Sequence, residues 1–191
     1  MISDVATRLF IERGFENVPV DEVAREANVA RKTVFNYFPR KEDLVFDRED
    51  EARAMVREAL AHRGERSPLH AFQVLMRALV KQQHRLFTVH RAPIRFWRMV
   101  AESPALTARA RELQVTFGED LAAMLAEAAG RTPDDPHARL AAAMLMDTLV
   151  VAYRAALRAY REKRAPQVAL VEVMRRGFAG VNAALKGTVY V

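Results

Sequence analysis

Residues 20–44, VDEVAREANVARKTVFNYFPRKEDL, contain two short amphipathic patterns on either side of a turn. Three residues with helical spacing give the first pattern one apolar side: Val23, Ala24 and Ala27. Asn28 then interrupts the pattern, and asparagine tolerates the left-handed backbone that a sharp turn requires. The second pattern has an apolar side made of Val34, Phe35 and Phe38. Pro39 ends it, because the residue before a proline avoids the helical conformation. The stretch therefore predicts a helix, a tight turn and a second helix.

Two helices held at a fixed angle by a short turn form the unit that places a helix in the DNA major groove. The second helix is expected to expose side chains that suit phosphates and base edges: Arg31, Lys32, Thr33, Asn36 and Tyr37. A solvated surface without a ligand is the simpler alternative for the basic residues. Within this pattern we interpret them as DNA ligands.

The charge of the chain supports this prediction only locally. The net charge of +6 is typical of a protein that binds nucleic acid. Residues 1–47, however, contain seven basic and nine acidic side chains, a net charge of 7 − 9 = −2. Between Glu26 and Glu42 there are four basic residues and no acid. The excess of positive charge over the whole chain therefore lies outside the predicted DNA-binding segment.

Several classes of protein are disfavoured by the composition. The 191 residues include no cysteine, which removes disulfides and thiolate metal sites. We find no stretch of about 18 uncharged apolar residues and no secretion signal, so we expect a cytoplasmic protein without a membrane span. The five histidines lack the spacing of a metal site, and there is no Gly-rich phosphate loop or nucleophile elbow. We therefore expect no cofactor and no enzymatic activity.

Nearly the whole chain has helical periodicity, and we predict an all-α fold of about nine helices. Three belong to the N-terminal segment, beginning with residues 2–13. The remaining predicted helices span 41–62, 69–86, 94–101, 106–129, 137–163 and 168–185.

The last two predicted helices suggest a dimer. Residues 140–153 are apolar on almost every side, and such a helix must be covered on both sides. Gly177 and Gly180 of the final helix would permit a close approach of another helix. We predict a symmetric four-helix interface of two copies, with these contact residues: Leu140, Val151, Val171, Gly177, Phe178 and Val181. The alternative is that both helices belong to an ordinary core.

Residues 2 to about 47 resemble the N-terminal domain of TetR-family transcriptional regulators. The resemblance rests on many spaced positions: Ala6, Leu9 and Phe10, Gly14-Phe15, Val20 to Ala24, Val29, Thr33 to Phe35, Tyr37-Phe38 and Lys41 to Leu44. It implies a DNA-binding domain at 1–47, an effector-binding and dimerisation domain at 48–191, and a recognition helix at 31–37. It also implies that Lys41 and Tyr37 contact phosphate. Phe35 lacks the hydroxyl of the tyrosine that is common in the family, so we expect it to pack.

The sequence departs from the family in its helix caps. Pro19 and Val20 replace the usual hydroxyl cap of the first helix of the motif, and Ala30 replaces the serine cap of the second. No basic arm precedes Ile2 in this sequence, unless the numbering begins inside a longer gene product. We therefore expect fewer phosphate contacts and a shallower dependence of DNA affinity on salt.

The middle helices carry residues that suit a pocket for an apolar or amphipathic effector. Methionines and flat aromatic rings adapt to such ligands, and a few polar groups would orient them. Our candidates are Phe72, Met76, His84, Trp97, Gln114, Phe117, Met144 and Asp147. Plain core packing is the alternative for the apolar ones, and a structural partner is the alternative for Asp147.

A basic stretch between Arg77 and Arg98 includes Arg77, Lys81 and Arg85 on one helix side. It is either a solvated surface or part of a site for an anionic effector, such as an acyl thioester of a nucleotide carrier.

The sequence as a whole predicts a homodimeric, ligand-responsive transcriptional regulator, expected to be a repressor that a small molecule releases from its operator DNA. The alternative is a helical small-molecule sensor or binding protein without specific DNA binding.

Overall fold

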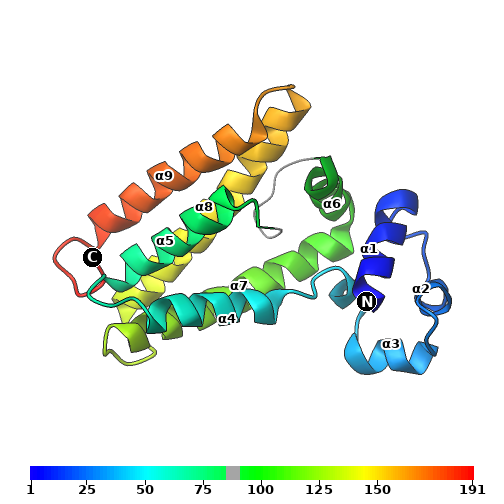
Figure 1. Cartoon of the computed structure of the whole chain (residues 1–191), viewed down its shortest axis with the longest axis horizontal. Helices are drawn as coiled ribbons and strands as arrows, with labels where there is room; N and C mark the ends of the chain where they lie inside the picture. Colours follow the sequence, from blue (N-terminus) through cyan, green and yellow to red (C-terminus); the bar gives the residue numbers. More distant parts are fainter. Residues whose placement is uncertain (85–90) are drawn as a thin grey trace. The chain divides into compact units, whose positions relative to one another are not determined.

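The computed structural model describes residues 1–84 and 91–191, which form nine α-helices and one 3-10 helix in those ranges. The chain divides into two compact units (Figure 1). Unit 1 comprises Met1–Asp50 and Arg91–Leu113, and unit 2 comprises Glu51–His90 and Gln114–Val191. The described part of the chain therefore has the predicted all-α fold.

Unit 1 contains the predicted DNA-binding segment. Its elements are α1 (Ile2–Arg13), α2 (Val20–Glu26), α3 (Arg31–Tyr37), the 3-10 helix η1 (Lys41–Leu44), α6 (Arg91–Glu102) and the beginning of α7 (Pro104–Ala128). Phe10, Val23 and Val34 from the first three helices share one core with Val100 of α6 and Leu106 of α7. The unit is therefore larger than the predicted domain of residues 1–47, because α6 and the start of α7 complete its core.

The turns of the helix-turn-helix have the predicted backbone. Asn28 lies between α2 and α3 with a φ of 53°, in the left-handed region. The Val29 N–H donates to the Ala24 carbonyl at 2.9 Å, and the Asn28 N–H donates to the Arg25 carbonyl at 3.1 Å. These two bonds close the end of α2 in a Schellman motif. Neither Pro19 nor Ala30 supplies a side-chain cap, as their residue types led us to expect.

The prediction of one continuous helix over residues 41–62 is wrong. The structure has η1 at Lys41–Leu44, a non-helical stretch, and then α4 (Glu49–Ala61). Phe46 lies in this stretch, and its ring meets the ring of Phe96 edge-on at a centroid distance of 6.4 Å. The interruption brings Phe46 to the core of unit 1, a contact between distant residues that helical periodicity does not reveal.

Unit 2 contains most of α4 and α7, together with α5 (Pro68–Lys81), α8 (Pro136–Arg161) and α9 (Pro166–Ala184). Figure 1 shows α8 and α9 running side by side along most of their lengths. Ser67 caps α5, and Asp135 caps α8 by accepting from two backbone N–H groups. The predicted helix at 69–86 ends earlier, at Lys81, because Gln83 adopts a φ of 51°.

Among the described helices, α8 is long and apolar enough to cross a membrane. Its most apolar window has a mean hydropathy of 1.6, and 28% of that window is buried. A core helix meets the same criterion, and in α8 the small residues Ala138, Ala142 and Ala156 are fully or almost fully buried. We interpret α8 as a helix that packs on α9 with one side and leaves apolar surface on the other.

Candidate nucleic-acid interface and effector region

The recognition helix α3 is held by its inner side and exposes the predicted ligands. Val34 is fully buried in the core of unit 1. Lys32 and Asn36 are exposed, and Tyr37 has 73% of its surface exposed. Thr33 is half-buried. The exposed positions of α3 therefore carry an ammonium, an amide and a phenol, which are groups that bind phosphates and base edges.

Arg31 differs from its neighbours because it already has partners within unit 1. Its Nε lies 3.0 Å from Oδ1 of Asp21, and both side chains are more than half exposed. Its guanidinium also lies 5.4 Å from the centre of the Phe35 ring. Phe35 is 37% exposed, and its ring packs against the guanidinium of Arg31 at the surface rather than in the core.

Lys41 points toward the interior of unit 1. Its Nζ donates to the Phe15 carbonyl at 2.6 Å and lies 4.4 Å from the centre of the Phe15 ring. Burial lowers the pKa of Lys41, while Glu16 and Glu42 oppose this shift. The ammonium that we predicted as a phosphate ligand therefore also supports the fold.

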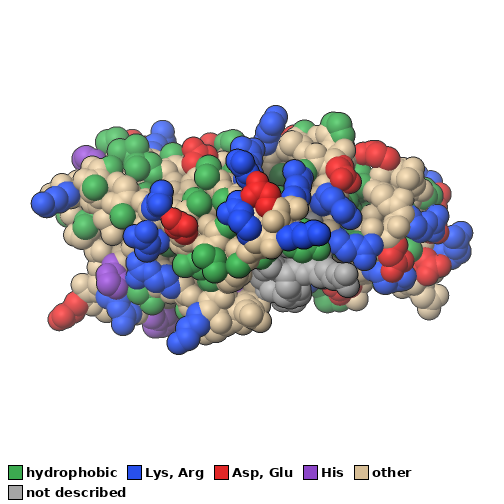
Figure 2. All heavy atoms as spheres, turned by 90° about the horizontal axis from the view of Figure 1, so that it is seen from above, with side chains coloured by type: hydrophobic (Ala, Val, Ile, Leu, Met, Phe, Trp, Pro, Cys, Tyr) green, Lys and Arg blue, Asp and Glu red, His purple; other side chains and the backbone are tan. Residues whose placement is uncertain are grey.

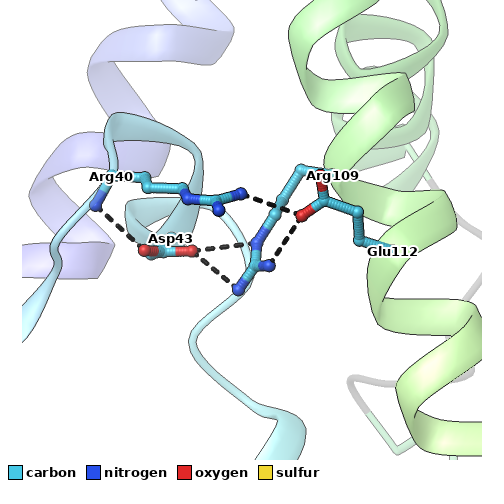
Figure 3. Close-up of polar contacts among 4 residues, drawn as sticks. All are labelled: Arg40, Asp43, Arg109 and Glu112. Atoms are coloured by element: carbon cyan, nitrogen blue, oxygen red, sulfur yellow. Dashed lines mark hydrogen bonds and ion pairs between the residues drawn. The ribbon is translucent and has the colours of Figure 1, made fainter.

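Beside Lys41, four charged residues form a network that joins η1 to α7 (Figure 3). Arg109 donates from Nε and NH2 to Oδ1 of Asp43, each at 3.0 Å. Its NH1 also donates to Oε2 of Glu112 at 3.0 Å, and Arg40 donates to the same oxygen at 2.9 Å. The partners lie 66 and 72 residues apart in the sequence, so sequence reasoning missed this network and no local pattern indicates it.

The predicted effector residues belong to both units of the chain. Seven belong to unit 2, whereas Trp97 belongs to unit 1, where its ring meets Phe96 edge-on at 5.3 Å. Phe72 and Met76 are buried in α5. Asp147 is exposed rather than enclosed, and it accepts a hydrogen bond from Gln114 at 3.0 Å. Two of the predicted polar pocket residues are therefore partners of each other.

Phe117, His84 and Met144 are each half-buried. Phe117 lies 5.9 Å from the guanidinium of Arg53, which pairs with Asp120 at 2.6 Å. The imidazole of His84 lies 3.7 Å from the carboxylate of Glu51. These contacts place charged groups of α4 beside two of the predicted effector residues.

Unit 2 contains an open cavity of about 350 Å³ between α4 and α5, a volume within the usual range for small-molecule sites. Its lining consists of Met55, Glu58, Ala59, His62, Arg66, Ala71, Val74 and Leu75. None of the predicted effector residues lines it. In the described part of the chain, no group of three or more acidic or histidine side chains is arranged to hold a metal ion.

Comparison with known proteins identifies the N-terminal segment. Residues 2–47 match the family model described as bacterial regulatory proteins, tetR family. A 40-residue segment is 52% identical to the mycofactocin biosynthesis transcriptional regulator MftR of Mycobacterium tuberculosis, and this match covers 21% of the chain and 20% of MftR.

Two solved structures extend the likeness over nearly the whole chain. Thermus thermophilus FadR, a TetR-family repressor in complex with lauroyl-CoA, is 26% identical with a TM-score of 0.55, covering 94% of this chain and 92% of FadR. The N-terminal segment of the chain, residues 2–47, therefore belongs to the TetR family. The fatty acid degradation regulator FadR of Bacillus halodurans, which is 20% identical, shares the fold with a TM-score of 0.56, covering 94% of this chain and 93% of that one.

The predicted dimer residues fall into two groups. Leu140, Val151 and Val171 are 46%, 51% and 45% exposed and are available to a partner. Phe178 and Val181 are 3% and 0% exposed, so their assignment to a dimer interface is wrong: they fill the core of unit 2. Figure 2 shows exposed hydrophobic side chains distributed among charged ones at the left, over the surface that α9 occupies.

Gly177 permits a close contact between two helices of the same chain. A Cβ added there would overlap the side chain of Thr148 in α8. The close approach that we predicted between copies is therefore a close approach of α8 and α9 in one chain. Gly180 has open space around it and remains compatible with a partner helix.

Proposed function

We propose that this chain is a DNA-binding transcriptional regulator that acts in the cytoplasm as a repressor and is released from its operator by a small molecule. The observation that carries the proposal is the outward side of α3, where Lys32, Asn36 and Tyr37 are exposed on a helix anchored by buried Val34. The match of residues 2–47 to the tetR family model supports the same conclusion. We assign base reading to Asn36 and phosphate binding to Lys32 and Tyr37.

The first test is a titration of labelled duplex DNA from the region flanking the chain's own gene, against a scrambled duplex of equal length. We expect tighter binding to the flanking duplex. Lys32→Ala should weaken binding to both duplexes and reduce the magnitude of the salt slope by about 0.9. Lys186→Ala is the control, because Lys186 is exposed and lies beyond α9. It should change neither the DNA affinity nor the salt slope. Equal affinity of the wild-type protein for the two duplexes would contradict specific recognition.

We propose that the active form is a homodimer that joins two copies through α8 and α9. The exposed apolar residues Leu140, Val151 and Val171 support this assignment. Small exposed residues on the second half of α9 would allow a close approach: Ala179, Gly180 and Ala183. Two recognition helices would then read half-sites roughly 34 to 36 Å apart on B-DNA.

We propose that unit 2 binds an amphipathic effector with an anionic part. Two observations support this class: Arg77 and Lys81 are exposed on α5, and the similar T. thermophilus FadR was solved with lauroyl-CoA. Lauroyl-CoA should raise the melting temperature more than coenzyme A alone and should weaken DNA binding. No thermal shift with either compound would contradict an acyl thioester effector.

A sensor without specific DNA binding is the second candidate. The absence of side-chain caps on α2 and α3 favours it, because each missing cap weakens the recognition element. This candidate predicts a thermal shift with effector and equal, weak affinity for both duplexes. The titration therefore separates the two functions.

A further inference from the structure

Arg40 is an exposed cation at the end of the helix-turn-helix. It lies between α3 and η1, and 58% of its side-chain surface is exposed. The next residue, Lys41, directs its ammonium to the Phe15 carbonyl instead. The exposed positive charge at this point of unit 1 is therefore the guanidinium of Arg40, a group that binds phosphate oxygens in a bidentate manner.

The guanidinium of Arg40 is paired with a carboxylate of α7. Its NH1 lies 2.9 Å from Oε2 of Glu112 (Figure 3). Glu112 is held in place by Arg109, and Arg109 in turn binds Asp43 of η1. Because Asp43 is three residues from Arg40, the network fixes the Glu112 carboxylate beside the Arg40 side chain.

The two halves of this network differ in exposure. Arg109 and Asp43 are 24% and 17% exposed, so this half is a partly buried connection between η1 and α7. Arg40 and Glu112 are 58% and 53% exposed, and an ion pair with this exposure adds little to stability. The hydrogen bond from Arg109 and the charge of Arg40 lower the pKa of Glu112, so the carboxylate is ionised at neutral pH. Arg40 can therefore exchange Glu112 for another anion at low cost.

We propose that Arg40 is a further DNA-backbone ligand and that Glu112 is an in-chain competitor, which occupies the guanidinium in the free protein and is displaced by a phosphate. This inference rests on the proposed DNA-binding function. Glu112 opposes binding in two ways, because its pair with Arg40 must break and its negative charge repels the approaching phosphate. The Arg109–Asp43 half remains in place during the exchange.

The test is a double-mutant cycle on DNA affinity with Glu112→Gln and Arg40→Ala. Glu112→Gln keeps the size of the side chain and an acceptor for Arg109, and it should tighten binding to every duplex severalfold. Arg40→Ala should weaken binding and reduce the magnitude of the salt slope by about 0.9. In the Arg40→Ala background, the gain from Glu112→Gln should shrink, since the broken pair no longer contributes.

Glu162→Gln is the matched control. Glu162 also lies on the surface and accepts from two arginines, Arg158 and Arg164, but it belongs to unit 2. The Glu162→Gln substitution removes one negative charge from the protein, as Glu112→Gln does, and should leave DNA affinity unchanged. Melting temperatures of all variants establish that each one is folded.

Three results would overturn the inference. They are an unchanged or weaker affinity of Glu112→Gln, an unchanged affinity and salt slope of Arg40→Ala, or an equal gain from Glu112→Gln in both backgrounds. If Asn36→Ala still alters base preference in those cases, the proposed function stands and only the role of Arg40 and Glu112 fails. Failure of the wild-type protein to bind any duplex overturns both.

Discussion

Neighbouring basic residues of unit 1 have different surroundings. Lys32 is exposed, Arg31 is paired with Asp21, and the ammonium of Lys41 donates to the Phe15 carbonyl. Sequence alone identified all three as DNA ligands by type and spacing. Only the structure separates a cation that is available to DNA from one that also holds the fold, because the partners of Lys41 lie in α1 and the turn after it.

Lys41→Met should affect both stability and DNA binding. The methionine keeps the apolar stem but removes the hydrogen bond to the Phe15 carbonyl, a loss of about 1 kcal/mol. It also removes a charge that would attract phosphate, so affinity for all sequences should fall. Lys32→Met is the control and should lower affinity without lowering stability, since Lys32 is exposed. Urea unfolding measures the first effect, and an unchanged midpoint for Lys41→Met would refute its role in the fold.

We expect the protein to lose stability at alkaline pH because of Tyr190. Burial and the nearby Asp135 raise the pKa of Tyr190 to about 12 from an ordinary value of 10.0. The folded protein therefore holds more protons than the unfolded chain between these values, and the free energy of unfolding falls as pH rises through this window.

Tyr190→Phe should remove this contribution, because it keeps the ring and deletes the ionising hydroxyl. Chemical denaturation from pH 9 to 12 measures the free energy of unfolding of both proteins. Between pH 10 and pH 12 the free energy of unfolding should fall more for the wild type than for Tyr190→Phe. Parallel curves would show that the Tyr190 phenol ionises equally in both states.

Two glycines of α9 give opposite predictions for the same substitution. A Cβ at position 177 would lie 2.8 Å from Cβ of Thr148, whose hydroxyl donates to the Met144 carbonyl. Gly177→Ala should therefore destabilise the α8–α9 pair by about 1 to 3 kcal/mol. Gly180→Ala meets nothing within 4 Å and should stabilise the protomer by roughly 0.5 to 1 kcal/mol.

Thermal unfolding measures both glycine variants at a protein concentration low enough to dissociate the proposed dimer, because Gly180 also lies in the proposed interface. Thr148→Ala combined with Gly177→Ala should recover part of the lost stability, since it removes the two outer atoms of the overlap. Equal melting temperatures for Gly177→Ala and Gly180→Ala would contradict the close approach of the two helices.

At the scale of elements, periodicity was sufficient to predict which segments are helical, and the turn around Asn28 was predicted from its residue type. The break between η1 and α4 could not be predicted from periodicity, because it depends on the packing of Phe46 against Phe96. The dimer prediction failed at Phe178 and Val181 for a related reason. A row of apolar residues along one helix indicates that another helix packs against it. It does not indicate whether that helix belongs to the same chain or to a second copy.

For the whole molecule, the dimer prediction can be tested at Val151. This α8 residue is 51% exposed, and Val151→Glu would place a carboxylate in the proposed apolar interface. Light scattering should give twice 21.6 kDa for the wild type and 21.6 kDa for the variant, with weaker DNA binding. Val115→Glu is the control, since Val115 is 63% exposed on α7 and outside the proposed interface. A dimeric Val151→Glu protein would exclude this interface.

The candidate site was predictable only in the part whose residues lie close together in the sequence. The exposed side of α3 follows from the residue types within one short segment, residues 31–37. The pairing of Gln114 with Asp147 was not predictable, and neither was the cavity, which is lined by residues of α4, α5 and the segment between them that share no local pattern. Helical spacing cannot show which sides of separate helices leave a space between them.

We propose that the outward side of α3 reads DNA sequence. The most direct measurement is the ratio of affinities for the flanking duplex and for variants with single base-pair substitutions, at one salt concentration, for the wild type and Asn36→Ala. We expect Asn36→Ala to flatten the ratio at particular base pairs by roughly 1 to 3 kcal/mol and to leave the other ratios unchanged. An identical set of ratios for the two proteins would contradict it.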